Sequence, residues 1–232
     1  MKILALETSA VAASVAVCED EELIAQSFQR TGLTHSATLM PMLEDMLKNA
    51  CLTLAEMDLI AVASGPGSFT GLRIGVSAAK GLAWTLDKPC ASVSTLEAMA
   101  WQLSGMEGVV CAAMDARRQQ VYNALFELKD GKPVRLSPDR AISLDDLGAE
   151  LANIEKNQIM VGDGAHLCYN AFQSYGYPVQ LAPPHLRFQS AWGVVRCALE
   201  QARAGQLTDA AGLVPNYHRL SQAERERLAK QS

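Results

Sequence analysis

The chain has 232 residues, of which 49% are hydrophobic and 19% are charged. This composition excludes an intrinsically disordered protein, and the length is sufficient for one large or two small domains that need no disulfide or metal to fold. The net charge of -5 argues against nonspecific attraction to nucleic-acid phosphates, which requires an excess of Lys and Arg. Any contact with RNA must therefore be local or be supplied by a partner.

The six cysteines are scattered without a CxxC spacing, and no run of about 18 apolar residues is present. Thiols in apolar surroundings are typical of small core residues in a reducing compartment. The N-terminal MKILALETSA has an acid at position 7 and therefore predicts a first strand rather than a signal peptide. We expect a soluble, cytoplasmic protein with no membrane association.

The first half of the chain predicts a β-meander followed by alternating helices and strands. Apolar residues spaced three and four apart indicate the first helix, with Thr34 or Ser36 as its N-cap, and Thr70 is the expected N-cap of the second. Short apolar runs between turn residues indicate the strands. The predicted elements are strands over 2–7, 14–18 and 23–29, a helix over 35–52, a strand over 59–64, a helix over 70–86, a strand over 90–94 and a helix over about 95–104.

The second half repeats this order. Its predicted elements are strands over 109–115, 121–128 and about 133–136, a helix starting near Ser143, and a strand over 158–165 that runs into Gly-Asp-Gly, as the strand over 59–64 runs into Gly-Pro-Gly. Sequence identity between the halves is negligible, so the similarity is one of pattern. Internal duplication is the simplest explanation.

These patterns predict an α/β fold of two ribonuclease-H-like domains, of the actin/Hsp70/sugar-kinase type, with mixed sheets flanked by helices. We expect an N-terminal domain over 1–104 and a smaller C-terminal domain over 105–232. The last predicted helices, over about 190–204 and 221–230, are expected to pack back on the first domain. The architecture alone does not define a function.

The stretch SGPGSFTGLRIGVSAAKGLAW (64–84) contains five glycines and has two interpretations. It is neither a Walker A loop nor a dinucleotide-binding motif, but the helix N-terminus offers free N–H groups to an anion. The anion-binding residues would then be Gly65, Gly67, Ser68 and Thr70.

The second interpretation concerns the helix itself. Gly71, Gly75, Ala79 and Ala83 recur every four residues and form a smooth ridge, which lets another backbone approach closely. Each glycine inside a helix costs about 1 kcal/mol relative to alanine, so several of them need a packing reason. We favour close packing, with the ridge facing a partner subunit.

Other candidate chemical groups are sparse. The histidines His35, His166, His185 and His218 form no HxxxH or HExxH pair, and there is no GxSxG nucleophile elbow. We therefore expect no catalytic residue, no metal site and no cofactor.

Two acids and two arginines stand at strand ends. Glu7 and Asp115 end the first strand of each half, but neither has a second acid nearby in the sequence, which favours a structural role in a turn. Arg117 and Arg118 form a candidate site for a phosphate or a partner carboxylate. In the alternative interpretation, Asp115 pairs with one arginine and the other is solvated.

The segments ILALETS, SGPGSFTGLRIGVSAAKGLAW, VSTLEAMA and MDARRQQVY closely resemble the bacterial TsaB (YeaZ) family. The resemblance covers residues 1–125 with specific motifs and continues loosely to LVPNYHR at 213–219. It implies a cytoplasmic, non-catalytic scaffold or activator of a tRNA-modifying complex. That complex transfers threonylcarbamoyl from threonylcarbamoyl-AMP to N6 of the adenosine beside the anticodon, in tRNAs reading codons that begin with A.

The resemblance also implies a degenerate relative of the catalytic subunit TsaD (Kae family). Where the catalytic subunit has a metal-binding HxxxH, this sequence reads Thr95-Leu96-Glu97-Ala98-Met99, so Thr95 and Met99 occupy the histidine positions. A hydroxyl and a thioether are poor ligands for the hard or borderline cations of such a site. The resemblance thus implies that the metal is absent.

The partners implied by the resemblance are TsaD, the ATPase TsaE, a second copy of the chain, and tRNA indirectly through the complex. Two N-terminal helices, here about 35–50 and 70–86, would form a four-helix contact with TsaD or with a second copy. We expect that Gly75→Leu or Ala79→Leu abolishes pairing and leaves the monomer folded. The expected interface residues are Leu39, Met42, Leu43, Met46, Leu72, Gly75, Val76, Ala79, Leu82 and Ala83.

Two enzymatic alternatives remain. A small kinase or ATPase of the same architecture would need an adenosine pocket and acids for Mg²⁺, for which Glu7 and Asp115 are the candidates. Titration with ATP and Mg²⁺ distinguishes this alternative from the scaffold. A metalloprotease is disfavoured by Thr95 and Met99, and metal content after purification tests it.

Overall fold

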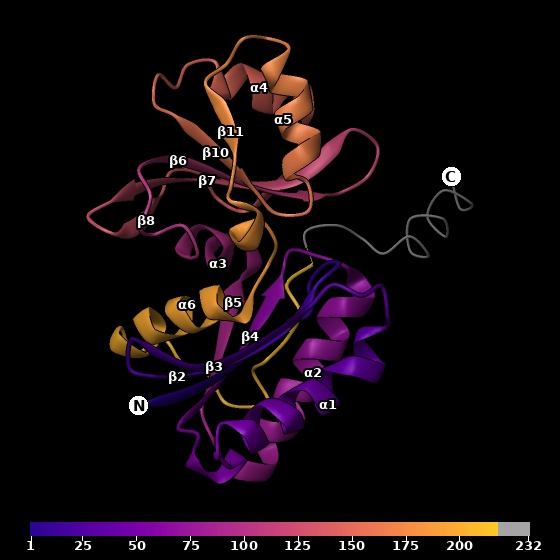
Figure 1. The fold of residues 1–232 in the computed structure, drawn as a ribbon, viewed down its shortest axis with the longest axis vertical. Coiled ribbons are helices and arrows are strands. Elements are labelled where there is room, and N and C mark those ends of the chain that lie inside the picture. The colour runs from indigo at the N-terminus through magenta and orange to yellow at the C-terminus, as the bar shows by residue number, and fades with distance from the viewer. Residues whose placement is uncertain (218–232) are drawn as a thin grey trace.

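Two β-sheets alternate with layers of helices in the computed structural model, which describes residues 1–217 (Figure 1). The predicted helix over about 221–230 and His218 lie outside the described residues. Within residues 1–217, no helix is both long and apolar enough to cross a membrane.

The first sheet has the strand order β3-β2-β1-β4-β5. Its central strands are buried on both faces, and their sequences are therefore nearly continuous apolar runs. Strand β1 pairs antiparallel with β2 and parallel with β4. The strands are β1 (Lys2–Glu7), β2 (Ala13–Glu19), β3 (Glu22–Gln29), β4 (Leu59–Gly65) and β5 (Cys90–Ser94).

Helices cover both faces of this sheet. Helices α1 (His35–Asn49) and α2 (Phe69–Leu86) pack on the face that carries Leu4 and Leu6. Helix α6 (Ala191–Arg203) packs on the opposite face, against Ile3 and Ala5. Successive side chains of a strand point to opposite faces, which divides β1 between the two cores.

The second sheet has the order β11-β10-β6-β7-β8. Helices α4 (Leu144–Leu151) and α5 (Ala165–Gln173) cover its outer face. The strands are β6 (Gly108–Asp115), β7 (Gln120–Lys129), β8 (Lys132–Arg135), β9 (Arg140–Ser143), β10 (Gln158–Val161) and β11 (Val179–Leu181), and short 3-10 turns occupy Leu54–Glu56 and Pro184–Leu186.

The two sheets share one topology when β8 and β9 are counted as one strand. In each sheet the order in space is then third, second, first, fourth and fifth, counted along the chain. In the second sheet, the edge position is divided between β8 and β9, which both pair with β7. The predicted α/β class with two mixed, helix-flanked sheets is confirmed, and the shared strand order agrees with internal duplication.

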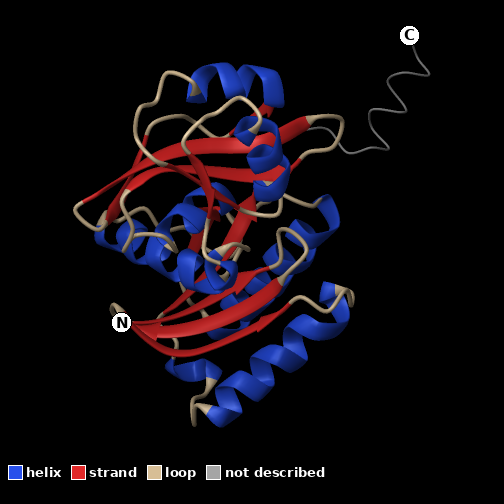
Figure 2. Ribbon diagram, turned by 45° about the horizontal axis from the view of Figure 1, so that its top comes forward, coloured by secondary structure: helices blue, strands red, loops and turns tan. Residues whose placement is uncertain are grey.

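Helices α3 (Thr95–Trp101) and α6 lie between the two sheets (Figures 1 and 2). Leu96 and Met99 of α3 pack on the second sheet, whereas Ala98 and Trp101 join the core that contains α6. A Cβ atom at Gly193 would lie 2.0 Å from the carbonyl oxygen of Ala98, so glycine there lets the two helices touch. Helix α6, the last helix within residues 1–217, is thus part of the layer that covers the first sheet.

The structure corrects two local predictions. Helix α2 begins at Phe69, and its N-cap is Ser68 rather than Thr70, because the Ser68 hydroxyl accepts a hydrogen bond from the Gly71 N–H at 3.3 Å. All six cysteines are free thiols, but Cys51 is exposed and only the other five are buried as predicted.

Candidate functional site at the domain junction

The glycine turn after β4 is packed against other parts of the main chain. A Cβ atom at Gly65 would lie 2.3 Å from the carbonyl oxygen of Asn216, and one at Gly67 would lie 2.4 Å from that of Ser9. The Ser68 N–H donates to the same Ser9 oxygen at 2.6 Å. Glycine is therefore required here because backbone segments approach closely.

This packing argues against the predicted anion site at Gly65, Gly67, Ser68 and Thr70. Two carbonyl oxygens border the turn, and they repel an anion. The N–H groups of Ser68 and Gly71 already have acceptors within the chain. The turn joins β4 to α2 and anchors the segment around Asn216.

The small-residue ridge of α2 faces the protein's own sheet. A Cβ atom at Gly71 would lie 2.1 Å from the carbonyl oxygen of Thr8, and one at Gly75 would lie 2.3 Å from the Thr8 hydroxyl. Ala79 and Ala83 are buried in the core between α1, α2 and the sheet. The prediction that this ridge faces a partner is wrong, because its small residues bring α2 close to β1.

Most of the other predicted interface side chains belong to the same core. Leu82 is half-buried, and the remaining nine residues are buried: Leu39, Met42, Leu43, Met46, Leu72, Gly75, Val76, Ala79 and Ala83. Because a Cβ atom at Gly75 would collide with the Thr8 hydroxyl, the structure argues against the expectation that Gly75→Leu leaves the monomer folded. A partner on these helices must instead contact their exposed faces, where Trp84 is 72% exposed and Met40 is 36% exposed.

The turn between β6 and β7 carries Asp115 and the two arginines. Asp115 accepts a hydrogen bond from the Arg117 N–H at 2.7 Å and lies 3.6 Å from its guanidinium, whose side chain is 86% exposed. Arg117, Arg118 and Gln119 all have positive φ angles, which side chains disfavour. The alternative in which Asp115 pairs with one arginine is the one observed, and Arg118 lines a shallow surface pocket of about 480 Å³.

Glu7 ends β1 and Asp163 follows the end of β10, and the negative charge of Asp163 acts on Glu7. We call the region around these two acids the domain junction. Glu7 is fully buried, and its Oε1 accepts a hydrogen bond from the Ser9 N–H at 2.5 Å. Burial raises the pKa of Glu7 to about 7, with a smaller contribution from the negative charge of Asp163. Burial also raises the pKa of Asp163, whose carboxylate accepts a hydrogen bond from Gln189 at 3.0 Å.

Sequence reasoning missed Asp163 and Gln189. Glu7 has no acid near it in the sequence, but the fold supplies one from the second domain. The available signal was the repeated strand-to-Gly-x-Gly pattern, because Asp163 occupies the second of these turns.

The junction contains buried polar atoms without partners in the described structure. Glu7 Oε2, Ser9 Oγ, Thr95 Oγ1 and Gln189 Oε1 are all buried and form no hydrogen bond. Thr95 and Met99 are themselves buried, and Met99 belongs to the apolar core under the second sheet. Among the described residues, no group of three or more His, Cys, Asp or Glu side chains is placed to hold a metal ion.

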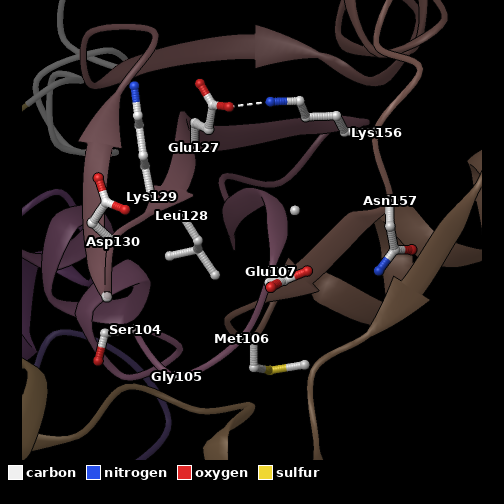
Figure 3. Close-up of a pocket in the computed structure, with 12 residues that line it drawn as sticks. Ser104, Gly105, Met106, Glu107, Glu127, Leu128, Lys129, Asp130, Lys156 and Asn157 are labelled. Atoms are coloured by element: carbon white, nitrogen blue, oxygen red, sulfur yellow. Dashed lines mark hydrogen bonds and ion pairs between the residues drawn. The ribbon is translucent and has the colours of Figure 1, made fainter.

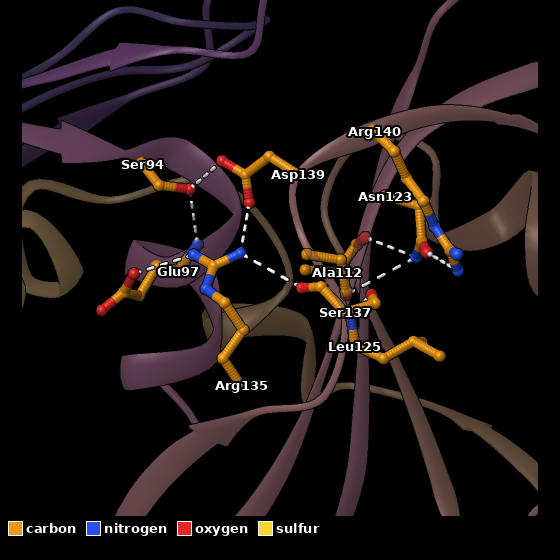
Figure 4. A network of polar contacts seen from close by, with 10 residues as sticks. Ser94, Glu97, Ala112, Asn123, Leu125, Arg135, Ser137, Asp139 and Arg140 are labelled. Atoms are coloured by element: carbon orange, nitrogen blue, oxygen red, sulfur yellow. Dashed lines mark hydrogen bonds and ion pairs between the residues drawn. The ribbon is translucent and has the colours of Figure 1, made fainter.

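A polar network holds α3 against the second domain (Figure 4). Arg135 of β8 donates to Glu97 at 2.8 Å and to Asp139 at 2.6 Å. Asp139 also accepts a hydrogen bond from Ser94, the residue that caps α3. Because these bonds link α3 to the strands of the second sheet, they fix the start of α3, and with it Thr95, at the junction.

A separate surface pocket of about 750 Å³ lies at the other end of β6 (Figure 3). Its walls come from the segments 104–108 and 127–131 together with Lys156 and Asn157, and an ion pair between Glu127 and Lys156 borders it. This pocket mixes acidic and basic side chains and has no contact with the domain junction. It does not contribute to the candidate site.

The architecture defines a class of protein: two ribonuclease-H-like domains, each with a mixed sheet flanked by helices. A component A of (R)-2-hydroxyglutaryl-CoA dehydratase from Acidaminococcus fermentans has the same fold, with a TM-score of 0.53, 15% identity, and coverage of 88% of this chain and 99% of that one. At this identity the similarity concerns the fold alone.

Sequence comparison defines the family. Residues 8–226 match the family described as TsaD, tRNA N6-adenosine threonylcarbamoyltransferase. The tRNA threonylcarbamoyladenosine biosynthesis protein TsaB of Bacillus subtilis is 32% identical over 235 residues, with full coverage of both chains. A Pseudomonas aeruginosa protein described as similar to peptidase YEAZ has a TM-score of 0.79 and 26% identity, covering 94% of this chain and 99% of that one. The chain belongs to the TsaB (YeaZ) family.

Proposed function

We propose that the chain is a non-catalytic subunit of the complex that forms threonylcarbamoyladenosine beside the anticodon of tRNA. Its family is named for this biosynthesis, which supports the pathway. The proposed role is to bind and activate a TsaD-type catalytic subunit, with a TsaE-type ATPase as third component and tRNA contacted through the complex. Such a complex works in the cytoplasm.

The proposal of a non-catalytic role rests on the residues at positions 95 and 99. The family resemblance places the catalytic subunit's metal-binding histidines there, and this chain has Thr95 and Met99. Both side chains are buried, and Met99 packs in an apolar core where a hydrated cation has no ligands. The carbonyl oxygens of Asn216 and Ser9 lie against Gly65 and Gly67, and this close approach further disfavours a nucleotide phosphate at the turn.

A reconstituted modification assay tests the proposal. Purified catalytic subunit, ATPase, tRNA and threonylcarbamoyl-AMP are combined with and without this chain. We expect modified adenosine only when the chain is present, and no product from the chain alone. Full activity without the chain would refute the activator role, and turnover of ATP by the isolated chain would favour the enzymatic alternative.

The proposed docking surface is the exposed side of α1 and α2. Trp84 is the most exposed of the described large hydrophobic side chains, at 72%, and Met40 lies on the neighbouring helix. Exposed aromatic residues are frequent anchors of protein interfaces. Gly81 lies one turn before Trp84, and no atom is near its Cβ position, which leaves space for a partner side chain.

Trp84→Glu is expected to weaken binding of the catalytic subunit at least ~10-fold, because it removes an apolar anchor and introduces a charge. Titration calorimetry with the purified catalytic subunit measures this change. Tyr175→Glu is the matched control, since Tyr175 is 63% exposed but lies in the second domain. Equal affinities of the two variants would contradict the proposed surface.

A further inference from the structure

Two cysteines of the second domain lie against each other in its core. Cys111 belongs to β6 and Cys168 to α5, and both side chains are fully buried. They are members of one hydrophobic cluster between the second sheet and its outer helices. A side-chain hydrogen bond joins the two thiols. The pair plays no part in the candidate site at the domain junction.

The packing of α5 on β6 explains this contact. Helix α5 follows β10, which is parallel to β6, and therefore runs back along both strands. At its start, the Gly164 N–H donates to the carbonyl oxygen of Ala113 at 3.1 Å. Cys168 lies four residues, or about 6 Å, further along the helix, and Cys111 lies two residues, or about 7 Å, back along the strand. Residues at these spacings share a face of their element, so the two thiols point into the same space.

A hydrogen-bond donor faces the sulfur of Cys111. The side-chain amide of Asn123 donates to Cys111 Sγ at 3.3 Å and to the carbonyl oxygen of Ala112 at 3.0 Å. Asn123 Oδ1 accepts a hydrogen bond from Arg140 at 3.3 Å, which holds the amide in this orientation (Figure 4). A donor at the sulfur stabilises the negative charge that develops when the thiol loses its proton.

Both thiols are protected while α5 is packed on the sheet. The hydrogen bond with Cys168, together with burial, raises the pKa of Cys111 well above its ordinary value, so the unreactive thiol form prevails. Helix α5 has nine residues and covers the outer face of the sheet, whereas β6 lies between β10 and β7. Local opening of this short helix therefore exposes Cys168 before Cys111.

We propose that Cys111 and Cys168 form a reversible oxidation site, in which hydrogen peroxide converts the two thiols into an intrachain disulfide between β6 and α5. When α5 opens, the Cys168 thiolate attacks the peroxide. An S–O bond forms, the O–O bond breaks, and the departing hydroxide takes up the proton lost by Cys168 to form water. When α5 closes, Cys111 attacks the sulfur of the resulting sulfenic acid. The S–S bond forms, the S–O bond breaks, and hydroxide leaves with the Cys111 proton as a second water.

The reaction is balanced, because the two thiols lose two electrons and the peroxide gains them. Formation of the disulfide protects both sulfurs from irreversible oxidation to sulfinic acid. Exchange with an external thiol breaks the S–S bond and returns both cysteines to the reduced form. The site contains no residue of α1 or α2, so its oxidation is independent of the proposed binding of the catalytic subunit.

Peptide mass mapping tests the site in a Cys51→Ser background, which removes the exposed thiol. The folded protein is treated with hydrogen peroxide, its free thiols are blocked with iodoacetamide in denaturant, and the chain is digested. We expect two peptides joined through Cys111 and Cys168, lighter by two hydrogen atoms than the reduced pair, and separated again by dithiothreitol. Cys90 is the internal control, because it is buried in a cluster whose described members include no other cysteine. Reduced Cys111 and Cys168 at every peroxide concentration that leaves the protein folded, or equal oxidation of Cys90, would overturn the proposal.

Two further variants test the order of the steps. Cys111→Ala leaves Cys168 without a thiol to react with, so dimedone, which labels sulfenic acids, is expected to label Cys168 after peroxide treatment. Cys168→Ala removes the thiol that attacks first, so Cys111 is expected to stay reduced. Circular dichroism verifies that both variants are folded, and the mapping above decides the proposal if either is not. Labelling of Cys111 in Cys168→Ala to the same extent would refute the order.

The rate of disulfide formation tests the opening of α5. In the wild type we expect the disulfide to form roughly 100-fold or more slowly than the exposed Cys51 is oxidised, because only molecules with an open α5 react. Urea below the unfolding midpoint is expected to accelerate the reaction. Equal rates at the two sites, with no effect of urea, would show that Cys168 reacts without opening and would overturn this mechanism.

Discussion

Gly71→Ala is expected to destabilise the protein by more than about 2 kcal/mol, although alanine is the better helix former. The added Cβ would lie 2.1 Å from the carbonyl oxygen of Thr8, so either α2 or β1 must move. The Thr8 hydroxyl also donates to the Gly71 carbonyl at 2.8 Å, and this buried hydrogen bond would be strained by the same movement. Urea denaturation followed by circular dichroism measures the change in the free energy of unfolding.

The same helix offers a matched control. Gly81 has no atom within 4 Å of its Cβ position and lies on the exposed side of α2. Gly81→Ala is therefore expected to stabilise the protein by about 0.5–1 kcal/mol through helix propensity alone. If both substitutions changed stability equally, the close approach of α2 to β1 would not be the reason for glycine at position 71.

Glu7→Gln is expected to remove a large pH dependence of stability. The pKa of Glu7 rises from 4.5 to about 7 on folding, chiefly through burial, so the folded state binds the proton more tightly. This group therefore stabilises the protein at low pH, and the stabilisation is lost as the pH rises from about 4.5 to 7. The loss amounts to roughly 3 kcal/mol for the wild type. The glutamine side chain stays neutral at every pH, so Glu7→Gln does not lose this stability as the pH rises.

Free energies of unfolding measured between pH 4 and 8 test this prediction. Above pH 7, Glu7→Gln is expected to be more stable than the wild type by roughly 3 kcal/mol, with the difference shrinking toward pH 4.5. Glu44→Gln replaces an exposed acid on α1 and is expected to follow the wild-type curve. Parallel curves for Glu7→Gln and the wild type would show that Glu7 is not buried as a neutral acid.

The prediction of the candidate site succeeded only in part. Close packing accounts for Gly65, Gly67, Gly71 and Gly75, whereas Gly81 is exposed and has no atom near its Cβ position. The ridge of α2 packs on the protein's own sheet and not on a partner subunit. The contact lies between α2 and Thr8 of the same chain, at a sequence separation of 63 residues for the Thr8–Gly71 hydrogen bond. A ridge of small residues has the same spacing whether a partner subunit or the protein's own sheet packs on it, so no local pattern distinguishes the two.

The sequence by itself determined the class of fold, the family, and the order of helices and strands. These features depend on hydrophobic periodicity, turn residues and short motifs, which are local properties of the chain. The tertiary structure alone decided which face of α2 is buried and that the charge of Asp163 acts on Glu7. Each of these depends on contacts between segments far apart in the chain, where packing and burial rather than local preference determine the outcome.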